Sequence, residues 1–84
     1  MYFVYVLLSK LDGKFYTGFT KDIETRLKQH NNGEVTSTKN RRPLELVYFE
    51  ASVNIKDAAH REKYLKTTYG KRYLRNRLKN YINE

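Results

Sequence analysis

Residues 4–18 read VYVLLSKLDGKFYTG, and this stretch predicts a β-hairpin around which the rest of the chain is arranged. Asp12-Gly13 is the turn signal, because glycine accepts the positive φ of a tight reversal and aspartate can bond to its own backbone. The β-branched and aromatic residues on either side suit a pleated surface. We therefore expect strands over about residues 2–8 and 14–19.

The two arms of this hairpin carry features of their own. The first arm is apolar on both faces, which is typical of a central strand covered on both sides. Each arm has one tyrosine near its middle, Tyr5 and Tyr16, so two phenols could meet at one point, although such tyrosines commonly only pack in the core or at its rim. Gly18 in the second arm indicates a bulge or a close approach by another group.

The composition describes a small, basic chain. Its 84 residues make a single domain, 1–84, with one modest core. Lys and Arg number 17 against 9 Asp and Glu, which gives a net charge of +8. Nucleic acid is the commonest partner of such a surface, while an anionic membrane or ribosomal RNA would satisfy the same charge.

Two absences narrow the classes of protein. There is no cysteine, which excludes a disulfide framework and a thiolate site and fits a reducing cytoplasm. No apolar run is long enough to cross a bilayer, so we expect a cytoplasmic protein without a membrane partner.

A first helix is expected over about residues 21–31. Thr20 is the predicted N-cap, and Asn32-Gly33 supplies the stop. Arg26 and His30 are four residues apart and flank the apolar stripe on the same side. The helix therefore offers a guanidinium and an imidazole at the edge of its buried face, which is formed by Ile23 and Leu27.

A polar, basic loop follows and leads into a third strand over about residues 44–49, opened by Pro43. Lys39, Arg41 and Arg42 form a basic cluster in this loop. It is either plain solvated surface or a contact for phosphate groups.

A second helix is expected to begin after Asn54, with Asp57 completing a variant of the capping box. Glu62 falls in the middle of its predicted inward face, where a carboxylate is costly unless it is paired. It either forms a salt bridge to Arg26 or a lysine, or it serves as a metal ligand or acid–base group in a cleft. The apolar residues of that face are Ile55, Ala58, Ala59 and Leu65.

Tyr69-Gly70 is expected to end this helix or its following turn, and a third helix then covers about residues 71–82. Its apolar stripe should close the core, and its outer face is basic. That face could contact a phosphate backbone or an anionic membrane. The stripe is Leu74, Leu78, Tyr81 and Ile82, and the basic residues include Lys71, Arg72 and Arg75.

The unusual residues together could cleave a phosphodiester. One carboxylate can hold a hard divalent cation that keeps most of its waters and borrows phosphate oxygens. An arginine can stabilise the oxyanion, and a tyrosine or histidine can take the proton of the attacking water. No Ser-His-Asp set, glycine-rich phosphate loop or zinc-ligand cluster is present.

This ordered set resembles the GIY-YIG nuclease superfamily, and most closely its small stand-alone bacterial members. The second name-giving tripeptide matches Tyr16-Thr17-Gly18, whereas the first departs in letters around Tyr5. Residues 26–31, Arg-Leu-Lys-Gln-His-Asn, look like the family's Arg-x-x-x-His/Tyr element. Glu62 looks like the family's metal-binding glutamate.

The resemblance implies an α+β fold, with a three-stranded antiparallel sheet flanked by three helices in the order β-β-α-β-α-α. It also implies roles. Tyr5 is the general base with His30 relaying its proton, Tyr16 positions the phosphate or water, Arg26 contacts the scissile phosphate, and Glu62 binds a single Mg²⁺ or Mn²⁺. Many active members have an asparagine where Leu74 stands, and Lys66 matches a lysine found after the glutamate in small members.

Three hypotheses follow for function. The first is a metal-dependent endonuclease on DNA, whose specificity comes from substrate shape or from a protein activator, as in repair or recombination. The second is a non-catalytic nucleic-acid-binding module on the same scaffold. The third is an interaction partner within a repair complex. The residues expected to contact nucleic acid are Lys39, Arg41, Arg42, Lys66, Lys71, Arg72 and Arg75.

Overall fold

The computed structural model describes all residues, 1–84, and is built on a three-stranded antiparallel sheet. Strand β1 (Tyr2–Ser9) lies in the centre, between β2 (Phe15–Thr20) and β3 (Leu44–Ser52). The predicted strands are confirmed, although β3 runs three residues past its expected end. The central position of β1 explains its two apolar faces, since each face packs against its own layer of helices.

The hairpin turn forms as the sequence predicts. Gly13 has a φ of 71°, and the Asp12 carboxylate accepts a hydrogen bond from the backbone N–H of Lys14 at 2.9 Å. In the resulting register Tyr5 lies directly opposite Gly18. The one irregularity of pairing falls between β1 and β3, after Val6, so Gly18 does not mark a bulge.

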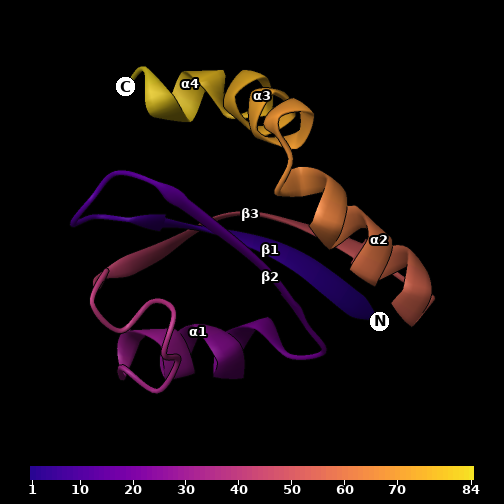
Figure 1. Cartoon of the computed structure of the whole chain (residues 1–84), viewed down its shortest axis with the longest axis horizontal. Coiled ribbons are helices and arrows are strands. Elements are labelled where there is room, and N and C mark those ends of the chain that lie inside the picture. Colours follow the sequence, from indigo (N-terminus) through magenta and orange to yellow (C-terminus); the bar gives the residue numbers. More distant parts are fainter.

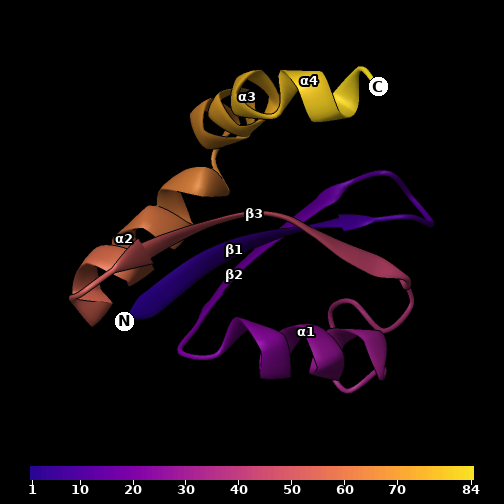
Figure 2. The same cartoon turned by 180° about the vertical axis from the view of Figure 1, so that it is seen from behind.

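The helices cover the sheet in two layers, which Figures 1 and 2 show from opposite sides. Helix α1 (Ile23–Asn31) packs on one face, against a small cluster formed by Tyr5, Leu7 and Leu44. Helices α2 (Ile55–Leu65), α3 (Thr68–Arg77) and α4 (Lys79–Ile82) lie on the other face. That side holds the larger core, with Val4, Val6, Ala58, Leu65 and Leu74. None of the helices has the length and the apolar character that a membrane-spanning segment requires.

The start of α1 differs from the prediction. Asp22, and not Thr20, is the N-cap, because the Asp22 carboxylate accepts from the Thr25 N–H at 3.2 Å. The Thr20 hydroxyl instead accepts from the N–H of Asp22 at 3.1 Å. Two candidate capping residues, two positions apart, compete for the same helix end, and the one closer to the helix prevails. The predicted stop is confirmed, since Asn32 is the C-cap and Gly33 has a φ of 78°.

The C-terminal helices also correct the sequence prediction. Helix α2 is capped by Asn54, whose side chain accepts from the Lys56 N–H, and it ends at Leu65. Tyr69 and Gly70 lie in the first turn of α3 and do not end α2. Thr67 provides the N-cap of α3 through a bond from the Gly70 N–H.

Gly70 makes the corner between α2 and α3 tight. It is buried, and a Cβ built on it would overlap the carbonyl of Tyr64 and the Cα of Leu65. Because Gly70 has no side chain, the backbones of the two helices can lie in contact at this corner.

The ends of the predicted apolar stripes lie outside the core. The expected third helix is divided at Leu78 into α3 and α4. Ile55 and Ile82, predicted to face inward, are each 47% exposed. Both stand in the terminal turn of their helices.

Candidate active site

Tyr5 is the centre of the candidate site. Its side chain is 2% exposed and projects from β1 towards α1. Its hydroxyl lies 2.9 Å from Nε2 of His30 and accepts a longer hydrogen bond, 3.4 Å, from Nε of Arg26. Tyr5, Arg26 and His30, which the sequence analysis grouped as candidate site residues, are therefore in direct contact through the Tyr5 hydroxyl.

The sequence placed His30 at the edge of the buried face of its helix, but in the structure the residue is fully buried. Its other ring nitrogen, Nδ1, is 2.7 Å from the hydroxyl of Thr38. Burial, and then the charge of Arg26, lower the pKa of His30 to about 4. The imidazole is therefore neutral at pH 7, with a hydrogen-bond partner on each nitrogen.

Tyr16 meets the same histidine from the neighbouring strand. Its ring packs edge-on against the His30 ring, with 5.1 Å between ring centroids, and the Tyr5 ring does so at 5.7 Å. The Tyr16 hydroxyl accepts a 3.4 Å bond from Ser37. The two phenols therefore converge on one imidazole, as two tyrosines on adjacent strands can.

Gly18 leaves the space that the Tyr5 phenol occupies. A Cβ built on Gly18 would stand 2.5 Å from the Tyr5 hydroxyl oxygen and 2.7 Å from Cζ. The close approach that the sequence indicated is thus the phenol of the paired residue. Since β2 is an edge strand, the Tyr5 phenol lies over the backbone of the outermost strand on this side of the sheet.

Arg26 is half-buried, and two of its three guanidinium nitrogens bond to protein. Nε donates to Tyr5, and Nη1 donates to the side-chain oxygen of Gln29 at 3.0 Å. Nη2 remains for a ligand. This arrangement holds the guanidinium in one orientation beside the phenol, as a phosphate contact requires.

Glu62 approaches from the other layer, on α2. Its side chain is 19% exposed, so it is only partly buried on the face that was expected to point inward, and of the expected ion pairs it forms the one to a lysine, Lys66, at 3.3 Å. Its charge is felt at Tyr5, where burial raises the pKa, Arg26 lowers it, and Tyr16 and Glu62 raise it further. Glu62 makes no hydrogen bond or ion pair with Tyr5, Tyr16, Arg26 or His30, so the contacts bring together those four predicted residues and not Glu62.

A divalent ion would find one carboxylate here. No group of three or more His, Cys, Asp or Glu side chains that could hold a metal ion occurs in the chain. A lone, half-buried glutamate suits Mg²⁺, which keeps several waters and completes its shell with substrate phosphate oxygens. It does not suit an ion held by protein ligands alone.

The predicted nucleic-acid contacts do not form one surface. Lys39 and Arg42 line a shallow depression of about 630 Å³. Arg41 is bound to Asp12 at 2.7 Å and to backbone carbonyls, so it fastens the loop to the hairpin turn. Arg72 lies 5.8 Å from the centre of the Tyr69 ring.

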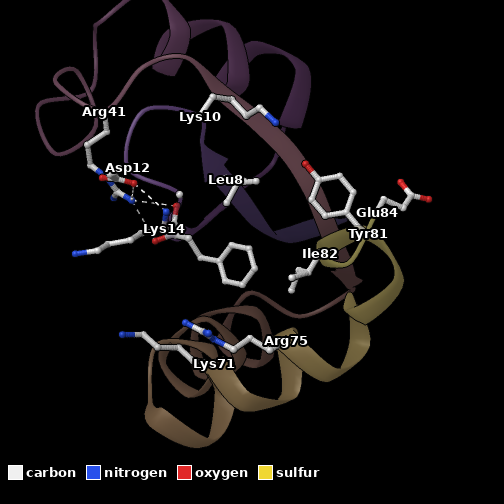
Figure 3. Close-up of a pocket in the computed structure, with 12 residues that line it drawn as sticks. Leu8, Lys10, Asp12, Lys14, Arg41, Lys71, Arg75, Tyr81, Ile82 and Glu84 are labelled. Carbon is white, nitrogen blue, oxygen red and sulfur yellow. Dashed lines mark hydrogen bonds and ion pairs between the residues drawn. The ribbon is translucent and has the colours of Figure 1, made fainter.

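Lys71 and Arg75 line a separate groove near the hairpin turn (Figure 3). Leu74, at the position of the family's asparagine, is fully buried in the core. No polar side chain therefore replaces that asparagine at this position.

Sequence reasoning missed Thr38 and Ser37. Both lie in the loop that was read as solvated surface or a phosphate contact, yet Thr38 is fully buried against His30. The available signal was a run of hydroxyl residues, Thr36-Ser37-Thr38, directly before the basic stretch at residues 39–42, and it did not separate a buried partner from a solvated one.

Comparison with known proteins agrees with this geometry. Residues 1–79 match the model of the GIY-YIG catalytic domain, so the chain belongs to the GIY-YIG family, a family of nucleases. Among its relatives it is similar to the UPF0213 protein of Clostridium perfringens, with 46% identity over 79% of this chain and 71% of the relative. It is also 40% identical to a UPF0213 protein of Staphylococcus aureus, over 88% of this chain and 90% of the relative.

A solved structure is similar as well. The solution NMR structure of a UPF0213 protein from Bacillus halodurans shares 35% sequence identity and aligns with a TM-score of 0.54. The alignment covers 88% of this chain and 82% of that one. The family and the fold expected from the sequence are therefore confirmed.

Proposed function

We propose that this protein is a metal-dependent endonuclease that hydrolyses phosphodiester bonds in DNA. The observation that carries the proposal is the hydrogen-bonded chain that runs from the half-buried Arg26 through Tyr5 and His30 to the buried Thr38. In this chain the Arg26 guanidinium could stabilise the charge on the phosphate, and Tyr5 could accept the proton of the attacking water.

The proton pathway follows from the donors available. Arg26 can only donate, so the Tyr5 oxygen accepts from it and the phenol can direct its own hydrogen to Nε2 of His30. Nδ1 of His30 then carries the hydrogen and donates to Thr38. In this tautomer the imidazole can accept the Tyr5 proton, and the phenolate can accept a proton from the attacking water.

Without substrate, the Tyr5 phenol and the His30 imidazole are both uncharged at pH 7. Burial raises the pKa of Tyr5 and lowers that of His30. Arg26 opposes the shift at Tyr5, because its charge stabilises a phenolate. The same guanidinium can reach a substrate oxygen through Nη2, so one side chain serves both the base and the phosphate.

Glu62 would hold the divalent ion, Mg²⁺ or Mn²⁺. When bound, the ion would add positive charge at the phosphate and lower the pKa of a coordinated water. Lys66, now paired with Glu62, would be free to contact a phosphate oxygen once another cation satisfies the carboxylate.

A plasmid-nicking assay tests the proposal. Wild-type protein with Mg²⁺ or Mn²⁺ should convert supercoiled DNA to the nicked form, and excess chelator should stop the reaction. Glu62→Gln keeps the shape of the side chain and removes its charge, so it should lose cleavage by about 100-fold or more. Thermal unfolding should show that it stays folded, and equal cleavage by this variant would remove the metal role of Glu62.

The buried Leu74 favours a second candidate, a nucleic-acid-binding module without catalysis. In that case the wild-type protein would bind DNA in chelator, with a steep dependence on salt, and would never nick it. A requirement for a protein activator, in repair or recombination, would appear as nicking only after that protein is added.

A further inference from the structure

A groove of about 900 Å³ lies between the hairpin turn and helices α3 and α4, beside the start of β2. Figure 3 shows side chains that line it from both segments. Tyr5, Arg26 and Glu62 do not line it, so it is separate from the candidate active site.

Several cations line this groove, and only some of them are neutralised. Arg41 is held by Asp12 at 2.7 Å, and Lys10 lies 3.4 Å from Glu45. Lys14, Lys71 and Arg75 are exposed, and none of them has a carboxylate partner within 4.0 Å. In Figure 3 these three cations gather on one side of the groove, while Glu84 lies on the other side.

The remainder of the lining is apolar and aromatic. Leu8, Phe15 and Tyr81 are half-buried in the groove, and the Tyr81 hydroxyl is fixed by a 2.6 Å bond to Glu45. Cations beside aromatic rings are the combination with which proteins hold a single nucleic-acid strand, because phosphates pair with the charges and bases stack on the rings.

The groove lies within reach of the candidate active site along the open edge of β2. Phe15 lines the groove on the face covered by α2–α4, and Gly18 lies beside the Tyr5 phenol on the face covered by α1; at about 3.3 Å per residue their backbones are about 10 Å apart along β2. One strand of stacked nucleic acid advances about 3.4 Å per nucleotide, so a strand that passes round the edge of β2 needs at least about three nucleotides to join the two sites. Glu62 stands on α2, in the same layer of helices as Lys71 and Arg75.

We propose that this groove binds a single-stranded segment of the nucleic acid at least about three nucleotides from the bond that is cut. One backbone phosphate lies among Lys14, Lys71 and Arg75, and one base lies against Phe15. The distance to the cut rests on the proposed nuclease function, but the binding itself does not require cleavage. The groove would thereby select substrates with an unpaired segment on one side of the scissile bond.

Binding in chelator tests the groove separately from catalysis. The measurement is fluorescence anisotropy with a labelled single-stranded oligonucleotide of about 12 nucleotides and with a duplex of the same sequence. The test variant is Lys71→Ala/Arg75→Ala, and the matched control is Arg77→Ala/Lys79→Ala. Both variants remove two exposed positive charges from α3 and α4, but only the first changes the groove.

The groove variant should bind the single strand at least about tenfold more weakly, with a salt slope smaller by about 0.7 for each lost phosphate contact. The control should stay within about threefold of wild type, and Phe15→Leu should weaken the single strand more than the duplex. Equal losses in the two double variants would overturn the proposal. So would a groove variant that loses binding to anionic vesicles or to a polyglutamate peptide but still binds the single strand like the wild type.

The two proposals fail in different ways. If wild-type protein never cleaves but the groove variant alone loses single-strand binding, the nuclease proposal is wrong and the groove stands. If wild-type protein cleaves and the groove variant binds like the control, the groove proposal is wrong and the nuclease stands.

Discussion

The contact between Gly18 and Tyr5 leads to a sharp prediction about one methyl group. In Gly18→Ala the added Cβ would stand 2.5 Å from the Tyr5 hydroxyl oxygen, whereas ordinary contact needs at least about 3.4 Å. The phenol must therefore move by about 0.9 Å. Its bonds to His30 and Arg26, at 2.9 and 3.4 Å, would lengthen beyond useful range.

The expected loss is mainly one of activity. A misplacement of about 1 Å can cost about 100-fold in rate, so nicking by Gly18→Ala should fall by about that factor. Overpacking should cost about 1–3 kcal/mol of stability, which a domain of this size tolerates. The assay pairs plasmid nicking in Mg²⁺ with thermal unfolding of the same preparations.

A double variant supplies the control. In Tyr5→Phe the hydroxyl is already absent, so adding Gly18→Ala should lower nicking far less than it does in the wild type. Independent, multiplicative losses would show that Gly18 acts elsewhere. Full activity of a folded Gly18→Ala would refute the reasoning that the position of the Tyr5 hydroxyl matters.

Three other predictions concern His30, its partner and the helix corner. Thr38→Val should slow nicking about tenfold or more and change its pH profile, because it removes the acceptor that fixes the His30 tautomer, and Thr38→Ser should restore both. The folded pKa of His30, about 4, lies below its unfolded value of 6.5, so its contribution to stability is complete above pH 6.5 and declines as pH falls towards 4. Wild-type protein should therefore lose about 2 kcal/mol of unfolding free energy between pH 7 and 5, measured by urea titration, and His30→Gln should lose clearly less. Gly70→Ala should lower the melting temperature by about 10 °C despite the better helix propensity of alanine, because the Cβ meets backbone; an unchanged melting temperature would show that the corner is loose.

The fold was predictable because local signals and burial agree. The Asp12-Gly13 turn, the doubly apolar first arm and the stop at Asn32-Gly33 each specify local geometry, and the structure confirms all of them. The α2–α3 corner was not predictable in this way. Gly70 looks like a helix end in the sequence, and its role inside a helix depends on which backbone lies beside it.

The candidate site was predictable in part. The spacing of Arg26 and His30 on one helix, and of Tyr5 and Tyr16 on paired strands, is local information and led to groups that are in contact. Thr38 could not be found, because its burial depends on how a loop folds back over α1. The roles of these residues, and that of Glu62 towards a metal, stay predictions.

Under the proposed nuclease function, the Gly70 corner would influence where the strand is cut. It joins the helix that carries Glu62 to the helix that carries Lys71 and Arg75, and the backbones touch there with no side chain between them. If both proposals hold, this joint would act as a fixed spacer, and the offset between the phosphate bound in the groove and the bond that is cut would be set by the protein rather than by the substrate. Inserting a residue between Lys66 and Thr68 should therefore move the position of the cut along the strand.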